Sequence, residues 1–382
     1  MQKFTKHILA AISVIALTHH LPLAAADSDV TELGRQLFFD NNLSFNRSQS
    51  CATCHNPAAG FVDDRDNGVG AAVSLGDDGL SLGSRSAPPA AYAALAPTFH
   101  YDTKTKQYIG GQFWDGRAKD LQEQAGGPPL NPLEMRMPNI ESIKKRIQEN
   151  SSYIKSFKHL YGNTVFDSSD KFYSAMTDAI ATFERSRFFS PFDSKYDRYL
   201  KGEYELSAQE ELGMALFFSN NNTNCSTCHA LHPEGHPRET FTNYQFHNIG
   251  VPVNNFLREA NIANRNIIDR GLLDNPAVDS VEHDGKFKVP TLRNVAITAP
   301  YMHNGVFKDL KTVMEFYDKY NNPQRVNNPE TGKPWNEPEV ETTINRQDLT
   351  ARKLSDQKID AIIAFLNTLT DKRYEYLLQT KE

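Results

Sequence analysis

Cysteine is scarce in this chain, and none is left over for a disulfide. The 382-residue sequence contains four cysteines, all within two Cys-x-x-Cys-His segments at 51–55 and 225–229. This pattern is the attachment signature of a c-type haem, in which two thiols bond to the vinyl groups and the adjacent imidazole ligates the iron. The sequence therefore predicts two covalent haems. The residues that would hold them are Cys51, Cys54, His55, Cys225, Cys228 and His229.

Two other roles for paired cysteines fit the sequence poorly. A zinc ribbon usually separates its pairs by about 15–20 residues and needs no histidine directly after each pair. Here the pairs lie far apart. A thioredoxin-like redox pair needs a surrounding βαβ pattern, and neither copy has β-branched runs typical of parallel strands beside it. Haem attachment accounts for both histidines as well as all four thiols.

Long apolar runs and an excess of positive charge are also missing. The apolar run at residues 8–17 is too short to span a bilayer, but basic residues precede it and three alanines at 24–26 follow it. We therefore expect residues 1–26 to be a signal peptide and the mature chain to begin near Asp27, in the periplasm. The net charge of −6 argues against a nucleic-acid partner.

The chain contains an internal repeat. The octapeptides at 32–39 and 211–218, each ahead of a haem motif, share Glu-Leu-Gly at the start and Leu-Phe-Phe at the end. Farther on, Asp-Ala-Ile-Ala-Thr-Phe at 178–183 recurs as Asp-Ala-Ile-Ile-Ala-Phe at 360–365. Self-similarity of this kind indicates a duplicated structural unit. A leading helix, a haem motif and a closing helix would make one cytochrome c-like unit, present twice.

We therefore expect a mainly α fold of two cytochrome c-like haem domains from an internal duplication, with few short strands. The N-terminal domain would cover residues 27–190, where Ser-Pro breaks the helix, and the C-terminal domain residues 207–382. Ser207 and Glu210 predict a capping box that opens the second unit, and Ser355 is the expected N-cap of its closing helix. Residues 321–339, rich in proline, glycine and asparagine, predict a surface loop.

The most unusual residues lie between the first haem motif and its closing helix. They read Gly-Gln-Phe-Trp-Asp-Gly-Arg at 111–117, Leu-Gln-Glu-Gln-Ala at 121–125 and Asn-Pro-Leu-Glu-Met at 131–135. Val-Pro-Thr-Leu-Arg-Asn at 289–294 and Ala-Pro-Tyr-Met-His-Asn-Gly at 299–305 follow later. Together with the haem motifs, these segments resemble the bacterial di-haem cytochrome c peroxidase family, which includes the MauG enzymes. The resemblance covers almost the whole mature chain.

The resemblance implies a set of residues around the first haem. Gln124 and Glu134 would line its open distal side, Pro128 would shape that pocket, and Trp114 would lie between the two haems. Cleavage of a peroxide O–O bond needs a proton moved from one oxygen to the other, which makes Glu134 the candidate general acid/base. From the residues alone, a solvated loop carboxylate is the favoured reading of Glu134 and an ordinary core aromatic that of Trp114, so both roles rest on the resemblance.

The distal ligands of the two haems are the next expectation. In the family's peroxidases a loop histidine can ligate the first haem, but residues 61–89 contain none here, so we expect an open haem without reductive activation; His100 is the nearest alternative. For the second haem, the resemblance places the distal ligand at Tyr317, as in MauG. Met314 lies one turn earlier on the same helix face and is the alternative, since methionine is the ligand in the peroxidases.

The family also binds calcium between its haems, through backbone carbonyls at the positions of Thr298 and Pro300 and an asparagine side chain. That asparagine position is Ser86 here, and a hydroxyl is a poorer ligand than an amide oxygen. A surface tryptophan that MauG uses toward its protein substrate is replaced by Asn-Thr-Asn at 222–224. The cofactors expected are thus two haem c groups and one calcium ion.

Three functions remain open at this point. The first is a periplasmic peroxidase that reduces hydrogen peroxide to water with electrons from a small cytochrome or cupredoxin. The alternative is a MauG-like enzyme that uses peroxide to oxidise residues of a partner protein. A non-enzymatic electron carrier is the third, but it would need two strong protein ligands on both irons. Family members are often homodimers, and the sequence itself carries no interface signature.

Overall fold

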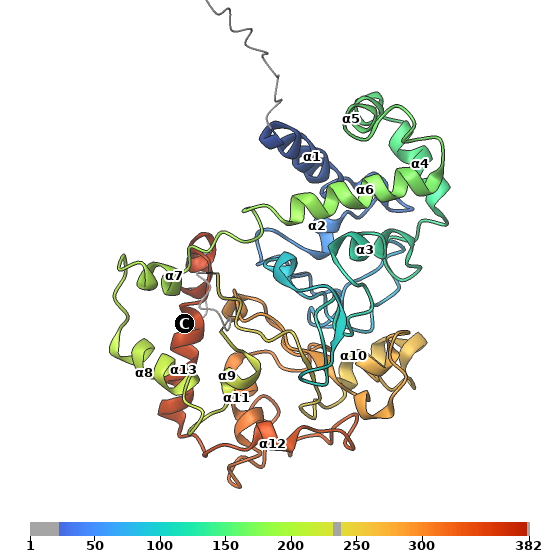
Figure 1. Cartoon of the computed structure of the whole chain (residues 1–382). Coiled ribbons are helices and arrows are strands. Elements are labelled where there is room, and N and C mark those ends of the chain that lie inside the picture. Colours follow the sequence, from blue (N-terminus) through green and yellow to red (C-terminus); the bar gives the residue numbers. More distant parts are fainter. Residues whose placement is uncertain (1–22, 232–237, 380–382) are drawn as a thin grey trace, which may run out of the picture.

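Helices dominate the computed structural model, which describes residues 23–231 and 238–379 (Figure 1). The predicted signal peptide at residues 1–26 lies outside this part except for its last four residues, where the first helix α1, Leu23–Phe38, begins. Within the described residues no helix is both long and apolar enough to cross a membrane. The prediction of a mainly α protein with few short strands is confirmed.

The elements follow the chain in a simple order. The first half contains α1, then α2 Cys51–Cys54, α3 Leu121–Ala125, α4 Ile140–Gln148, α5 Ser151–Tyr161 and α6 Ser169–Glu184. The second half contains α7 Lys195–Leu200, α8 Ala208–Phe217, α9 Cys225–Cys228, α10 Asn255–Ala260, α11 Leu310–Asp318, α12 Arg346–Leu349, α13 Asp356–Asn367 and α14 Glu375–Leu378. Two antiparallel pairs complete the fold: β1 His100–Asp102 with β2 Gln107–Ile109, and β3 Phe246–His247 with β4 Phe287–Lys288.

Each half is organised around one pair of packed helices, α1 with α6 and α8 with α13 (Figure 1). The two crossings use a glycine in the same way. A Cβ on Gly34 would lie 1.9 Å from the carbonyl oxygen of Ala179, and a Cβ on Gly213 would lie 1.9 Å from that of Ala361. Only glycine permits so close an approach of helix backbones. Internal duplication stays a prediction, and this correspondence supports it.

The expected helix starts of the second half are present. Ser207 accepts a hydrogen bond from the backbone N–H of Glu210, whose carboxylate accepts from the N–H of Ser207, so the predicted capping box begins α8. Ser355 caps α13 by accepting from the N–H of Lys358. Both predictions are confirmed.

The first closing helix ends earlier than its Ser-Pro signal suggests. Helix α6 stops at Glu184 because the chain must turn to bury Phe189, which is fully enclosed and packs on Phe61 with ring centroids 4.5 Å apart. Helix α7 lies within residues 191–206, which the sequence-based prediction assigned to neither domain. Tyr196 of α7 belongs to the hydrophobic core of the second half, so this helix packs with the second unit.

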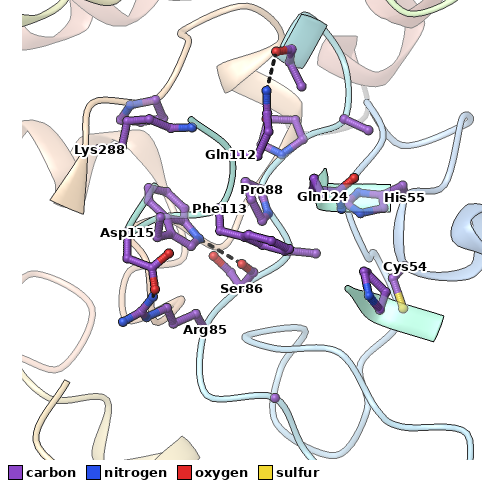
Figure 2. A pocket seen from close by; sticks show the side chains of 18 of the residues that line it. Cys54, His55, Arg85, Ser86, Pro88, Gln112, Phe113, Asp115, Gln124 and Lys288 are labelled. Carbon is purple, nitrogen blue, oxygen red and sulfur yellow. Dashed lines mark hydrogen bonds and ion pairs between the residues drawn. The ribbon is translucent and has the colours of Figure 1, made fainter. Parts of the chain in front are cut away.

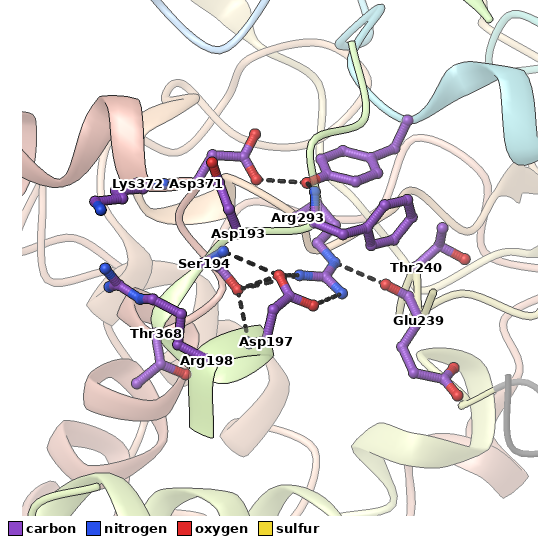
Figure 3. A network of polar contacts seen from close by, with 12 residues as sticks. Asp193, Ser194, Asp197, Arg198, Glu239, Thr240, Arg293, Thr368, Asp371 and Lys372 are labelled. Carbon is purple, nitrogen blue, oxygen red and sulfur yellow. Dashed lines mark hydrogen bonds and ion pairs between the residues drawn. The ribbon is translucent and has the colours of Figure 1, made fainter. Parts of the chain in front are cut away.

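A buried polar network fixes α7 and joins the two halves (Figure 3). The guanidinium of Arg293, which is almost fully enclosed, donates to both carboxylate oxygens of Asp197 at 2.6 and 2.9 Å and to the hydroxyl of Ser194 at 3.1 Å. The phenol of Tyr92, from the first half, donates to the Asp371 carboxylate of the second. Because each buried charge has partners, the network holds the units in one arrangement.

Candidate functional site

The first cavity lies against the first haem motif and has a volume of about 460 Å³. Its walls bring together the predicted residues, which are Cys54, His55, Trp114, Gln124, Pro128 and Glu134. Figure 2 shows Cys54 and His55 on one side of this cavity and Arg85 and Lys288 on the other. The sequence-based grouping of these residues around one space is therefore reproduced by the fold.

The imidazole of His55 is prepared to bind a metal through one nitrogen. Its Nδ1 hydrogen-bonds the backbone carbonyl of Phe61 at 3.1 Å, which leaves Nε2 without that partner. Burial lowers the pKa of His55, so the ring is neutral and can donate a lone pair. A backbone carbonyl on the second nitrogen is the usual way in which a protein orients a metal-binding histidine.

Glu134 lies in the same cavity with one direct partner. Its Oε1 accepts a hydrogen bond from the Nδ2 of Asn131 at 2.7 Å. Burial raises the pKa of Glu134, while the charge of Arg117 and the bond from Asn131 oppose the rise. A carboxyl group whose pKa is moved toward neutrality can both hold and release a proton, as general acid/base catalysis requires.

The local chain explains why Gln124 and Glu134 share one cavity. Asp120 caps α3 by accepting from the N–H of Glu123, which sets the short helix that carries Gln124. Pro128 then opens a single 3₁₀ turn, Pro128–Leu130. Its carbonyl accepts from the backbone N–H groups of Asn131 and Met135, both at 3.2 Å. The loop that bears Glu134 is thereby folded back toward Gln124.

Among the described residues that line the first cavity, His55 is the sole histidine. His100 lies on strand β1, is exposed, and hydrogen-bonds the carbonyl of Thr98 through Nδ1 at 2.8 Å. It lines none of the cavities described here. The described lining of the first cavity therefore offers amide and carboxyl groups but no second imidazole.

The second cavity, of about 230 Å³, is built on the second haem motif and is lined by Cys225, Cys228 and His229. The Nδ1 of His229 hydrogen-bonds the backbone carbonyl of Phe241 at 3.1 Å, repeating the arrangement at His55. Burial lowers the pKa of His229 to about 4, so this ring is also neutral. Both motifs thus present a neutral, oriented imidazole to a cavity, with the Cys54 thiol beside it in the first and both thiols in the second. Imidazole and thiols are the donor set that a c-type haem needs.

Helix α11 places both ligand candidates at the second cavity. Met314 is 6% exposed and belongs to the hydrophobic core of the second half, whereas Tyr317 is not part of that core. Burial raises the pKa of Tyr317, and its side chain lines the same cavity as Cys225 and Cys228. Its surroundings favour Tyr317 as the group that faces the cavity.

Trp114 lines both cavities, as the resemblance implies for a residue between two haems. Its indole Nε1 donates to the backbone carbonyl of Ser86 at 2.9 Å. A segment of the second half, Lys288, Val289 and Pro290, lines both cavities as well. Trp114 and this segment therefore form a wall shared by the two sites.

The three residues predicted to bind calcium meet beside this wall. Ser86, Thr298 and Pro300 all line a small cavity of about 90 Å³, although more than 200 positions separate the first from the others in the sequence. The Ser86 hydroxyl donates to the carbonyl of Met302 at 3.1 Å and keeps its oxygen lone pairs. Oxygen donors gathered in this way suit a hard cation.

Sequence reasoning gave no role to several polar side chains of the first cavity, among them Arg117, Asn131, Glu184 and Lys288. Arg117 and Asn131 stand in segments that the sequence analysis singled out. Glu184 is 5% exposed, and burial raises its pKa to about 8. In the repeat it matches Leu366, which lines the second cavity. That exchange of leucine for a carboxyl group was readable from the aligned closing helices.

Comparison with known proteins accounts for this pair of cavities. A family model described as di-haem cytochrome c peroxidase matches residues 28–205. The methylamine utilization protein MauG of Paracoccus denitrificans is 49% identical over 93% of this chain and 92% of its own length. The chain belongs to the di-haem cytochrome c peroxidase family. It is accordingly an oxidoreductase of the class that acts on peroxide, and the family implies two haem c groups.

Two further members of this family show how far the similarity extends. The cytochrome c peroxidase Ccp of Escherichia coli is 30% identical over 92% of this chain and 60% of its own length. The crystal structure of the di-haem peroxidase BthA from Burkholderia thailandensis superposes with a TM-score of 0.80 at 30% identity. It covers 91% of this chain and 87% of BthA. Both peroxidases and MauG proteins are therefore relatives of the chain.

Proposed function

We propose that this protein is a periplasmic peroxidase that reduces hydrogen peroxide to water at the first cavity, with electrons from a small redox protein entering at the second. The observation that carries the proposal is the difference between the two cavities. The first cavity is lined by Glu134 and Gln124 and, among the described residues, by no histidine other than His55. The second cavity is lined by Tyr317. A haem bound through each motif would supply the electron-transfer chemistry.

The side chains of the first cavity have distinct tasks in this proposal. Glu134, held by Asn131 at 2.7 Å, takes the proton from one peroxide oxygen and returns it to the other, so that the leaving oxygen departs as water. The Gln124 amide donates to bound peroxide and orients it. Arg117, which also lines the cavity, adds positive charge while its guanidinium lies over the Phe113 ring, 3.7 Å from the centroid.

The shared wall and the second cavity complete the proposed route for electrons. Trp114 contacts both spaces and is the candidate relay between them. His229 and Tyr317 are the residues that would hold the haem iron at the second cavity. Ser86, Thr298 and Pro300 would hold a calcium ion against the same wall, where it would stiffen the contact between the halves.

A second candidate function is supported by specific observations. The MauG protein of Paracoccus denitrificans is 49% identical, and Tyr317 matches the ligand type implied for MauG. In that case the electrons would come from side chains of a partner protein. The Asn-Thr-Asn sequence at 222–224, in place of a surface tryptophan, speaks against the same route for those electrons.

Stopped-flow mixing of the ferric holoprotein with one equivalent of hydrogen peroxide tests the common step. A rapid change in the haem absorption is expected, and no change would overturn both functions in favour of an electron carrier. Adding a reduced mono-haem cytochrome c or a reduced cupredoxin then separates the two. Donor oxidation in a 2:1 ratio to peroxide supports the peroxidase, since two electrons reduce one peroxide. Failure of both donors, with peroxide-dependent change in a partner protein, supports the alternative.

A further inference from the structure

Lys288 occupies a special place in the wall between the two cavities. It ends strand β4 and lines both spaces, together with Trp114 from the other half. In Figure 2 its side chain lies on the side of the first cavity that is remote from Cys54 and His55. Its backbone N–H donates to the carbonyl of Trp114 at 2.8 Å, which fixes the lysine to the first half.

The ammonium group of Lys288 has more donors than the protein uses. Its Nζ donates to the backbone carbonyl of Gly111 at 2.5 Å, and within the described residues it forms no ion pair. The nearest acid, Asp115, is already engaged by Arg85 at 2.6 Å and Arg117 at 3.1 Å. An ammonium carries three N–H donors, and a buried charge without a counter-ion is costly. Burial accordingly lowers the pKa of Lys288 to about 8.

The other cations of this region are already paired. Arg85 donates to both oxygens of Asp269, at 2.7 and 2.6 Å, and to Asp115. Arg117 is bound to Asp115 and is partly exposed. Arg352 lines the second cavity but not the first. A cofactor group that brings negative charge to the wall shared by both cavities would therefore find its free cation in Lys288.

Haem has such groups at the appropriate edge. The vinyl groups that bond to the cysteines lie on one side of the porphyrin, and the two propionate carboxylates lie on the opposite side. Since the cysteines are remote from Lys288 in the first cavity, the propionate edge would be directed toward the shared wall. This step relies on the two-haem content of the family and not on which donor or substrate the enzyme uses.

We propose that the ammonium of Lys288 is a shared counter-ion for propionate groups of both haems and sets the two reduction potentials together. A positive charge beside the propionates offsets their negative charge and favours the reduced iron, because reduction adds one electron to the site. Lys288 is thus a positioning and electrostatic residue. The carbonyls of Gly111 and Trp114 hold Lys288 in place, so that the lysine would link bound propionates to the first half.

Redox titration of the holoprotein, followed by absorption at both haems, tests the proposal. In Lys288→Met both midpoint potentials are expected to fall, whereas Lys288→Arg, which keeps the charge, should stay near wild type. Lys286→Met is the matched control, because Lys286 is close by in the chain, contacts His283 at 3.4 Å and lines neither cavity. Resonance Raman spectra should show shifted propionate bending bands in Lys288→Met alone.

Several results would overturn the proposal. Unchanged potentials at both haems would show that Lys288 does not act on the propionates. A fall at one haem only would show that it is not a shared counter-ion. An equal fall in Lys286→Met would indicate a general effect of the lost charge. If Lys288→Met does not retain haem, Lys288→Gln keeps the polarity and approximate length without the charge, and the same criteria apply. The redox titration measures no peroxide turnover, so its result does not depend on whether the protein is a peroxidase.

Discussion

In the first cavity His55 shares its space with several amide and carboxyl side chains, Gln124 and Glu134 among them. In the second, His229 shares a largely apolar space with Tyr317 and two further histidines, His247 and His303. His55 and His229 themselves are held alike, each by a backbone carbonyl at 3.1 Å. The difference teaches that attachment and reactivity are built by separate parts of each unit. The motif and its carbonyl hold the cofactor, and the opposite wall decides whether peroxide can react there.

The largest expected effect follows from removing the carboxyl group of the first cavity. Glu134→Gln keeps the shape and the contact with Asn131 but cannot transfer a proton, so the rate of the reaction with peroxide should fall roughly 100- to 10,000-fold. Stopped-flow absorption of the ferric holoprotein measures this rate. Glu123→Gln, at an exposed position of helix α3, is the control and should react as wild type. An undiminished rate in Glu134→Gln would remove the acid/base role.

Ligand substitutions at the second cavity sharpen the other side of the comparison. Tyr317→Phe removes the phenol oxygen while keeping the ring, so the absorption and magnetic circular dichroism bands of the second haem should change completely. Met314→Leu should leave them unchanged, because Met314 is packed in the core. If the two variants exchange these outcomes, the thioether is the ligand and the second cavity is of the peroxidase type.

Substitutions at the two helix crossings test whether the crossings contribute equally to stability in the two units. Gly34→Ala and Gly213→Ala each place a methyl group 1.9 Å from a carbonyl oxygen of the closing helix. Each should lower the free energy of unfolding by about 3 kcal/mol, since neither helix can shift without disturbing its core. Chemical denaturation of the holoprotein measures both, and a large effect at one glycine alone would contradict the equivalence.

A pH-dependent effect is expected at the closing-helix position that holds Glu184 in one unit and Leu366 in the other. Burial raises the pKa of Glu184 from 4.5 to about 8, so the folded state binds the proton more tightly than the unfolded state. The contribution of Glu184 to the free energy of unfolding is complete below pH 4.5. It declines by roughly 1.4 kcal/mol per pH unit as the pH rises to 8. Glu184→Gln should lose this slope in denaturation series at several pH values, and an unchanged slope would assign it to other groups.

Much of this arrangement was predictable because its signals are local. The two haem motifs, the capping box at Ser207 and the cap at Ser355 each depend on a few neighbouring residues, and all are found where the sequence places them. The distal set of Gln124, Pro128 and Glu134 came from family resemblance, and the fold collects it in one cavity.

The contacts that sequence could not supply join distant parts of the chain. Arg85 pairs with Asp269, and Lys288 meets Gly111, each across more than 170 residues. Such contacts depend on how the two halves pack, which no local pattern encodes. The early end of α6 has the same origin, because burial of Phe189 against Phe61 overrides the helical tendency of the intervening residues.

The carbonyls that hold the two histidines belong to Phe61 and Phe241, which are both fully enclosed and both have a positive φ, 62° and 55°. Because the acceptor is main chain, no single side-chain replacement can exchange it for a carboxylate and make the imidazole more basic. Single substitutions can therefore change the side chains of the cavity wall that faces each histidine, but not the acceptor that holds the histidine. A protein that holds two cofactors in the same way can still give them different chemistry through the walls that face them.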